Sequence, residues 1–142
     1  MDETVRKTLQ ISAKRISFLN PKWDGFVKDL VLEVIRKLGV PAPNRSNVRA
    51  ELYKHLLYEE GDKFKPHKDT EKIDGMFGTL VICLPSEHEG GEVYLQHGKD
   101  SLELSTATTS AYGYYYLAWY ADVTHEIKPV RKGYRWVLTY NL

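Results

Sequence analysis

The periodicity of the apolar residues changes at Val48 and stays changed to the end of the chain. Beyond this residue the pattern has a period of two, which is typical of strands whose alternate side chains face opposite sides of a sheet. Turn-forming residues, chiefly glycine, divide this stretch into seven segments: 48–58, 78–84, 92–97, 102–104, 114–120, 126–130 and 134–141. A short eighth strand is predicted at 64–67. Seven or eight short strands at this spacing indicate a sandwich or a barrel.

The part of the chain before Val48 has a helical pattern instead. Residues 1–20 are weakly helical, and residues 21–38 carry apolar side chains at i, i+3 and i+4 over about four turns. Asn20 is the predicted N-cap, Pro21 the first helical residue and Gly39 the residue that follows the helix. The length of 142 residues suits a single domain, with a helical N-terminal layer (1–47) packed on a β core (48–142).

Charge and cysteine content exclude several classes of protein. The net charge is +1 and the basic residues are scattered, so neither nucleic acid nor a membrane surface is indicated as a partner. No apolar run is long enough to cross a bilayer. The single cysteine, Cys83, lies in an apolar run and excludes an intramolecular disulfide, which favours an intracellular location, in the cytoplasm or the nucleus.

Two potential metal ligands, His67 and Asp69, lie one residue apart within EEGDKFKPHKDTEK. Residues i and i+2 of a strand share a face, so an imidazole and a carboxylate can converge there on one cation. A distant histidine, His125, would complete a facial triad that leaves three positions open for other ligands. Arg135 follows in an apolar and aromatic strand, where a buried charge needs a partner. It either binds an anionic ligand, lies on a solvent-facing edge or pairs with an acid such as Asp122.

Three stretches resemble the prolyl 4-hydroxylase-like branch of the Fe(II)/2-oxoglutarate-dependent dioxygenases. LYKHLLYEEGDKFKPHKDTEK resembles the first core strands, with a tyrosine, a glycine-containing turn, an aromatic residue and the HxD pair. GTLVICLPSEHEGGEVYLQHG resembles the following hairpin, and YLAWYADVTHEIKPVRKGYRWVLTYNL resembles the end, with the distal histidine and a basic residue. The resemblance covers 48–142 and implies a double-stranded β-helix, or jelly roll, buttressed by the helix and holding the metal in its open end.

The resemblance also implies a role for individual residues. His67, Asp69 and His125 match the iron ligands, and Arg135 matches the basic residue that binds the distal carboxylate of 2-oxoglutarate, where many prolyl hydroxylases have lysine. Tyr58 matches a tyrosine that hydrogen-bonds this cosubstrate. Thr139 shares a strand face with Arg135 and is expected to line the same pocket. The implied cofactors are Fe(II), 2-oxoglutarate and O₂, with ascorbate as reductant.

Two positions depart from the pattern of the family. Many collagen-type and algal prolyl hydroxylases have a threonine near the cosubstrate where this chain has Val93. Some relatives have an Arg-x-Ser pattern, where this chain has Val137. Neither departure affects the iron ligands, but both weaken the inference that the substrate is a peptidyl proline.

The implied function is hydroxylation of a C–H bond with release of succinate and CO₂. A peptidyl proline is the leading substrate, with another side chain or a small molecule as alternatives. One competing hypothesis is a non-catalytic jelly-roll binding module with a structural or vestigial metal site. Another is a zinc-dependent hydrolytic site. Both competing hypotheses leave Arg135 without a role.

The remaining histidines and tryptophans are interpreted as structural. His55, His88 and His97 are expected to be surface or packing residues, and Trp119 and Trp136 to be core aromatics or part of a substrate wall. Residues 70–76 follow the HxD pair and are predicted to form a loop at the lip of the site.

Overall fold

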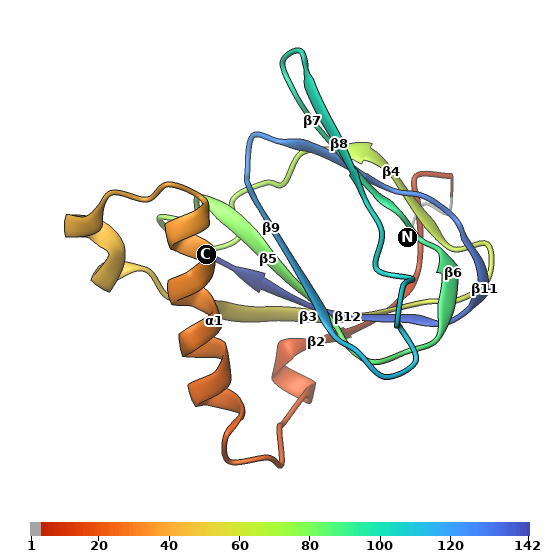
Figure 1. Ribbon diagram of the computed structural model, residues 1–142, viewed down its shortest axis with the longest axis horizontal. Coiled ribbons are helices and arrows are strands. Elements are labelled where there is room, and N and C mark those ends of the chain that lie inside the picture. The colour runs from red at the N-terminus through yellow and green to blue at the C-terminus, as the bar shows by residue number, and fades with distance from the viewer. Residues whose placement is uncertain (1–3) are drawn as a thin grey trace.

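The final strand of the sequence lies at the centre of an antiparallel sheet. The computed structural model describes residues 4–142, in which β12 (Arg135–Asn141) pairs on both of its sides. The order of this sheet is β2 (Leu9–Ser12), β3 (Glu51–Tyr58), β12, β5 (Gly78–Cys83) and β9 (Tyr115–Tyr120). It is called the helix-covered sheet below, because α1 packs on its outer face (Figure 1).

A second antiparallel sheet, called the opposite sheet, faces the inner side of the first. Its order is β1 (Arg6–Lys7), β4 (Lys63–His67), β10 (Thr124–Ile127), β7 (Val93–His97) and β8 (Asp100–Leu104). A separate pair, β6 (His88–Gly90) and β11 (Val130–Gly133), lies at one end, and the β7–β8 hairpin projects from the body (Figure 1). Two facing antiparallel sheets of this kind confirm the predicted double-stranded β-helix, or jelly roll.

Two hydrophobic clusters hold the layers together. Between α1 and the helix-covered sheet, Ile35 packs with Leu80 and Leu138. Between the two sheets, Val137 packs with Ile127. Val137 and Leu138 are neighbours in β12 yet belong to different clusters, because successive strand residues face opposite sides. The central strands of this sheet are therefore buried on both faces, as the fully buried β5 shows.

Helix α1 (Trp23–Lys37) confirms the predicted amphipathic helix. It begins later than predicted: Asn20 Oδ1 accepts a hydrogen bond from the Lys22 backbone N–H at 3.0 Å, in the turn before the helix. Gly39 follows the helix with a φ of +79°, as the sequence predicted. A 3₁₀ helix, η2 (Ala42–Asn47), leads into the sheets. Within residues 4–142, no helix is long and apolar enough to cross a membrane.

The predicted helical character of residues 1–20 is wrong. Residues 1–3 lie outside the described part of the chain, and residues 4–20 contain β1, β2 and a short 3₁₀ helix, η1 (Ala13–Arg15), but no α-helix. β1 pairs with β4 and β2 pairs with β3, so this segment adds an edge strand to each sheet. The local helical preference of this segment is weak. Pairing with the unpaired backbone groups at the edges of two sheets stabilises the extended conformation instead.

The predicted strand at 126–130 is also wrong, because it is two strands. β10 ends at Ile127 and β11 begins at Val130. Pro129 lies between them and has no N–H to donate to a ladder. The chain changes partners here, from β7 to β6. β6 was not predicted, because its three residues lie in a glycine-containing segment that resembles a turn.

Candidate metal centre

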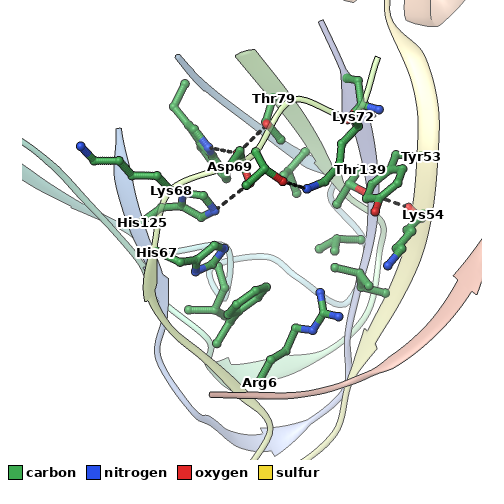
Figure 2. A pocket seen from close by; sticks show the side chains of 18 of the residues that line it. Arg6, Tyr53, Lys54, His67, Lys68, Asp69, Lys72, Thr79, His125 and Thr139 are labelled. Atoms are coloured by element: carbon green, nitrogen blue, oxygen red, sulfur yellow. Dashed lines mark hydrogen bonds and ion pairs between the residues drawn. The ribbon is translucent and has the colours of Figure 1, made fainter. Parts of the chain in front are cut away.

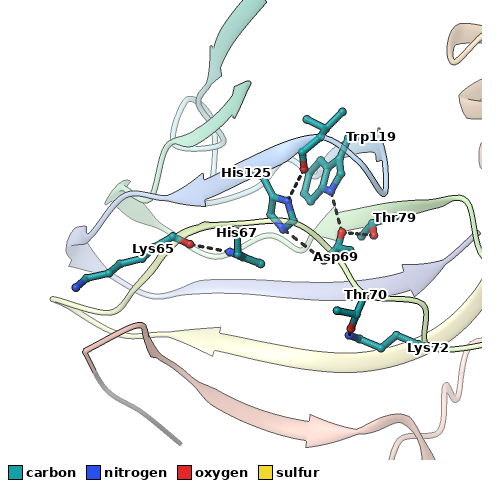
Figure 3. Close-up of polar contacts among 9 residues, drawn as sticks. Lys65, His67, Asp69, Thr70, Lys72, Thr79, Trp119 and His125 are labelled. Atoms are coloured by element: carbon teal, nitrogen blue, oxygen red, sulfur yellow. Dashed lines mark hydrogen bonds and ion pairs between the residues drawn. The ribbon is translucent and has the colours of Figure 1, made fainter. Parts of the chain in front are cut away.

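Three potential ligands converge between the sheets. His67 ends β4, His125 lies in β10, and the two residues are register partners. Their ring centroids are 4.0 Å apart, and His125 Nε2 lies 3.5 Å from Asp69 Oδ1. One ligand atom from each of the three residues lies within 4.8 Å of the others (Figure 3). The structure therefore brings together the three residues that the sequence singled out.

Asp69 is positioned differently from the prediction. β4 ends at His67, so the strand face shared by residues i and i+2 does not place this carboxylate. Instead, Asp69 Oδ2 accepts hydrogen bonds from Thr79 Oγ1 at 2.7 Å and from Trp119 Nε1 at 3.1 Å (Figure 3). These donors lie on β5 and β9 of the helix-covered sheet. They occupy one oxygen and leave Oδ1 on the side of His125.

Both imidazoles are oriented by backbone carbonyls. His67 Nδ1 lies 2.7 Å from the Lys65 carbonyl oxygen, and His125 Nδ1 lies 3.3 Å from that of Val123 (Figure 3). A carbonyl oxygen can only accept, so Nδ1 carries the proton and Nε2 keeps its lone pair. This arrangement is the common way in which proteins fix the tautomer of a metal-binding histidine.

The protonation states of the two histidines suit metal binding. Burial lowers the pKa of His67 to about 4, with a further lowering by the neighbouring His125. Burial also lowers the pKa of His125, although the carboxylate of Asp69 acts in the opposite direction. Both rings are therefore neutral at pH 7, and only a neutral imidazole binds a metal. Two neutral imidazoles and one carboxylate form the donor set that suits Fe(II).

Arg135 and Tyr58 lie side by side in the same cavity. They are register partners on β12 and β3, and the guanidinium carbon lies 5.5 Å from the centre of the tyrosine ring. Arg135 is 1% exposed. Its second terminal nitrogen has no hydrogen-bond partner within residues 4–142. The alternative that Arg135 pairs with Asp122 is wrong, because Asp122 is exposed and lies 3.1 Å from His97 Nε2.

A short chain of buried groups holds the guanidinium. Arg135 Nε donates to Thr106 Oγ1 at 3.1 Å, and Thr106 Oγ1 lies 2.9 Å from His88 Nε2. His88 Nδ1 lies 2.7 Å from the carbonyl oxygen of Ser86, so Nδ1 carries the proton and Nε2 accepts from the Thr106 hydroxyl. Burial lowers the pKa of His88, which keeps this ring neutral. Of the two predicted possibilities for His88, a surface or a packing residue, the structure shows the second, since His88 is buried and hydrogen-bonded to Ser86 and Thr106.

Glycine at position 91 leaves room for the arginine. A Cβ atom there would lie 2.8 Å from Arg135 Cδ, closer than such contacts occur, and the φ of Gly91 is +66°. Of the two valines that depart from the family pattern, Val137 lines the cavity and Val93 is fully buried between the sheets. The polar side chains that line the cavity therefore come from other positions, among them Tyr58, Thr79 and Thr139.

One cavity of about 280 Å³ is lined by all six residues that were predicted to hold the metal or the cosubstrate, namely His67, Asp69, His125, Arg135, Tyr58 and Thr139. Thr139 lines it as predicted, although its hydroxyl donates to the Lys54 carbonyl at 3.2 Å. Trp119 also lines it, whereas Trp136 is 42% exposed and lies against His55, so Trp136 is not a core aromatic. Residues of the predicted lip contribute as well. Lining residues that the sequence did not suggest include Arg6, Tyr53, Lys54, Lys68 and Thr79 (Figure 2).

A family model described as the 2OG-Fe(II) oxygenase superfamily matches residues 53–142 of this chain. The chain belongs to this superfamily. Membership implies Fe(II), 2-oxoglutarate and O₂ as the reactants that the site handles. The residues fit them: the donor set suits Fe(II), and a buried guanidinium with an unpaired nitrogen suits a carboxylate.

Solved structures share the fold of this 2OG-Fe(II) oxygenase. A prolyl-4-hydroxylase from Pseudomonas putida aligns with a TM-score of 0.59 at 15% identity, covering 99% of this chain and 74% of its own. A prolyl hydroxylase from Trichoplax adhaerens, solved with a peptide fragment of hypoxia inducible factor, aligns with a TM-score of 0.63 at 15% identity, covering 98% and 64%. A 2OG-Fe(II) oxygenase family protein from Burkholderia pseudomallei aligns with a TM-score of 0.56 at 18% identity, covering 96% and 63%. The present chain thus spans about two thirds of their length. A comparison with curated proteins found no match.

Proposed function

We propose that this 2OG-Fe(II) oxygenase hydroxylates a C–H bond of a peptide or small-molecule substrate, with a peptidyl proline as the leading candidate. In this proposal His67, Asp69 and His125 hold Fe(II), while Arg135 and Tyr58 bind 2-oxoglutarate. The observation that carries it is the buried, incompletely paired guanidinium of Arg135 in the same cavity as the three potential ligands. A purely structural metal site has no use for such a group.

The bound metal and cosubstrate supply the oxidising chemistry, in which one oxygen atom enters the substrate and 2-oxoglutarate leaves as succinate and CO₂. The protein positions the cosubstrate and the metal relative to each other. Arg135 fixes the distal carboxylate by charge-assisted hydrogen bonds and so determines which end of the cosubstrate reaches the metal. Burial raises the pKa of Tyr58 to about 12, so its hydroxyl stays protonated and can donate to the same carboxylate. The surrounding apolar side chains keep water away from this ion pair.

Three further parts of the proposal rest on the residues or on the family. We propose that residues 1–142 act as one domain. The helix-covered sheet packs on α1 through one hydrophobic cluster and on the opposite sheet through the other. Ascorbate is proposed as the reductant that keeps the iron ferrous between turnovers. An intracellular location stays a prediction that rests on the single, buried Cys83.

The deciding experiment is an anaerobic titration of the Fe(II)-loaded protein with 2-oxoglutarate, followed by the visible metal-to-ligand charge-transfer band. His125→Ala is expected to abolish the band. Arg135→Ala is expected to need roughly tenfold to a hundredfold more 2-oxoglutarate, because a hydrogen bond to a charged group contributes about 1.5–3 kcal/mol. Arg131→Ala is the matched control, since Arg131 is exposed and pairs with Glu92 at 3.0 Å. Absence of the band in folded, iron-loaded wild type would refute the oxygenase and favour the non-catalytic binding module.

A further inference from the structure

Four cationic side chains surround the mouth of the cavity. Arg6 comes from β1, Lys54 from β3, and Lys68 and Lys72 from the segment after β4 (Figure 2). These four residues are called the basic rim below. Within residues 4–142, none of them forms an ion pair. Asp69 is the one carboxylate among the residues that line the cavity in this described part of the chain.

The proposed metal and cosubstrate do not account for these charges. The formal charges of Fe(II) and Arg135 would be balanced by Asp69 and the two carboxylates of 2-oxoglutarate, and a histidine that binds a metal does so as a neutral imidazole. The loaded centre is therefore neutral without the basic rim. The net charge of the whole chain is only +1, so this concentration of positive charge is a local feature and not a property of the surface as a whole.

Two lysines of the rim converge on one aromatic ring. Lys54 Nζ lies 4.9 Å and Lys72 Nζ lies 5.9 Å from the ring centre of Tyr53. Their hydrogen-bond partners are uncharged: Lys54 donates to Gln10 Oε1 at 2.6 Å, and Lys72 donates to the hydroxyl of Thr70. Two ammonium groups that approach the same ring without a carboxylate repel each other, and an anion bound between them would relieve this repulsion.

Arg6 lies on the other side of the cavity. Its guanidinium carbon lies 4.9 Å from the ring centre of Phe64, which in turn stacks on His67 with 3.5 Å between ring centres. No hydrogen bond of this guanidinium occurs within residues 4–142, although the guanidinium group offers five donors. Because Arg6 belongs to the opposite sheet and Lys54 to the helix-covered sheet, the rim presents positive charge on both sides of the mouth (Figure 2).

The size of the cavity favours an extended substrate. At about 280 Å³ its volume lies just below the usual range for ligand pockets, roughly 300–1,000 Å³. The cosubstrate would occupy the deep part between Arg135 and the three ligands. A cavity of this volume has no room for a whole peptide beside the cosubstrate, so most of a polypeptide substrate would lie across the mouth, against the rim. A nucleic acid would require a longer basic track, and here the loop that carries Lys72 also carries Glu71 and Asp74.

Building on the proposed function, we propose that the substrate is an acidic polypeptide segment, with Asp or Glu on both sides of the residue that enters the cavity. The backbone crosses the mouth, one side chain points to the metal, and flanking carboxylates pair with Lys54 and Lys72 on one side and with Arg6 and Lys68 on the other. The neutral loaded centre and the unpaired rim together give this site its selectivity for charge.

The test uses a synthetic pool of random peptides with Fe(II), 2-oxoglutarate, ascorbate and O₂. Mass spectrometry identifies the peptides that gain one oxygen atom. Asp and Glu are expected to be enriched about threefold at each of several flanking positions, which corresponds to exposed ion pairs. The double variant Lys54→Glu/Lys72→Glu is expected to prefer Lys and Arg on one flank. Lys14→Glu/Lys28→Glu has the same change of charge at exposed positions outside the cavity and is expected to keep the wild-type preference.

Several results would overturn the proposal. These are hydroxylated peptides without acidic flanks, no hydroxylated peptide although 2-oxoglutarate is consumed, and an unchanged preference in Lys54→Glu/Lys72→Glu. A higher 2-oxoglutarate requirement of this variant in the charge-transfer titration would also overturn it, because the rim would then serve the cosubstrate.

Failure of the proposed function is distinguishable from failure of the substrate assignment. If wild type shows no charge-transfer band, binding of fluorescein-labelled heptaglutamate to the metal-free protein still tests the rim. Binding that weakens in Lys54→Glu/Lys72→Glu, but not in Lys14→Glu/Lys28→Glu, supports the acidic segment. Equal binding by all three proteins, or tighter binding of a single-stranded oligonucleotide than of heptaglutamate, refutes it.

Discussion

Arg135 is the residue on which most of the chemical argument depends. A guanidinium that is 1% exposed would be costly to bury alone, and within the described residues it receives one side-chain acceptor, Thr106. The proposed carboxylate of 2-oxoglutarate would satisfy the nitrogen that Thr106 does not reach. Thr106 and His88 then act as positioning residues, since Thr106 contacts the arginine, His88 contacts Thr106, and neither lines the cavity.

Replacing Thr106 with valine tests this positioning role. Valine has the same shape but cannot accept from Arg135 Nε, so the guanidinium loses its fixed orientation. We expect the concentration of 2-oxoglutarate needed for half of the charge-transfer signal to rise about tenfold, from the loss of a hydrogen bond to a charged group. Thr108→Val, at an exposed position nearby in sequence, is the control. A fall in melting temperature with an unchanged 2-oxoglutarate requirement would show that Thr106 is only structural.

The histidine at the end of this chain of hydrogen bonds predicts a pH dependence of stability. Burial lowers the pKa of His88 from an ordinary value of 6.5, so the unfolded chain binds a proton that the folded chain resists. Stability is therefore complete above about pH 6.5 and is lost as the pH falls toward the lower folded pKa. Urea midpoints of metal-free protein at about pH 7.5 and about pH 5 are expected to differ less in His88→Gln than in wild type. Exposed His97→Gln is the control, and an equal loss in all three proteins would contradict the prediction.

Only some of the residues that form the candidate site could be predicted from the sequence. The sequence singled out His67, Asp69, His125 and Arg135 by residue type and order, and the structure places them in one cavity, while their roles stay predictions. Thr79 and Thr106 were not found, because each acts on a residue that is distant in sequence. A threonine in a strand pattern carries no local sign of such a contact.

At the scale of elements, α1 stabilises the sheet that carries Arg135. Ile35 is fully buried against the helix-covered sheet, whereas Leu32 on the same helix is 58% exposed. We expect Ile35→Ala to lower the free energy of unfolding by about 2–5 kcal/mol, because it leaves a cavity. Leu32→Ala is expected to change it by about 0.5 kcal/mol or less. Chemical denaturation measures both, and similar losses in the two variants would mean that α1 does not pack as described.

Elements formed by interactions between residues close in sequence were predictable, whereas elements formed by pairing with distant strands were not. α1 was predictable because its apolar residues repeat locally. β1 and β2 were not, because they form only where β4 and β3 offer unpaired edges. β6 and β11 pair with each other at one end of the jelly roll, and no local pattern distinguishes such short strands from turns.

At the scale of the molecule, the candidate metal centre joins the two sheets. His67 and His125 lie on the opposite sheet, whereas Asp69 is held by Thr79 and Trp119 of the helix-covered sheet. A bound cation would therefore link both layers. A sandwich or barrel was predictable from the number and spacing of the strands, and the resemblance to a family implied the jelly roll, but the cavity and its basic rim depend on how the sheets face each other.

This link predicts that a divalent metal stabilises the whole fold. Adding Fe(II) anaerobically at about 100 times its dissociation constant is expected to raise the free energy of unfolding by about 2.7 kcal/mol. His67→Ala is expected to lose the effect. His97→Ala keeps it, because His97 lies outside the cavity and pairs with Asp122. Thermal denaturation with and without metal measures this, and equal stabilisation of both variants would place the metal elsewhere.

The central position of β12 also determines the order in which the molecule can be made. A ribosome synthesises β3 and β5 long before β12, yet β3 lacks its main partner, and β5 one of its two partners, until β12 arrives between them. Such non-local pairing is slow to form, and the nascent chain meanwhile presents two open, apolar strand edges that invite aggregation. Arg135 arrives with the same strand. A growing chain therefore cannot assemble the complete pocket before β12 has been synthesised, and its demand for chaperones is expected to be highest just before β12 leaves the ribosome.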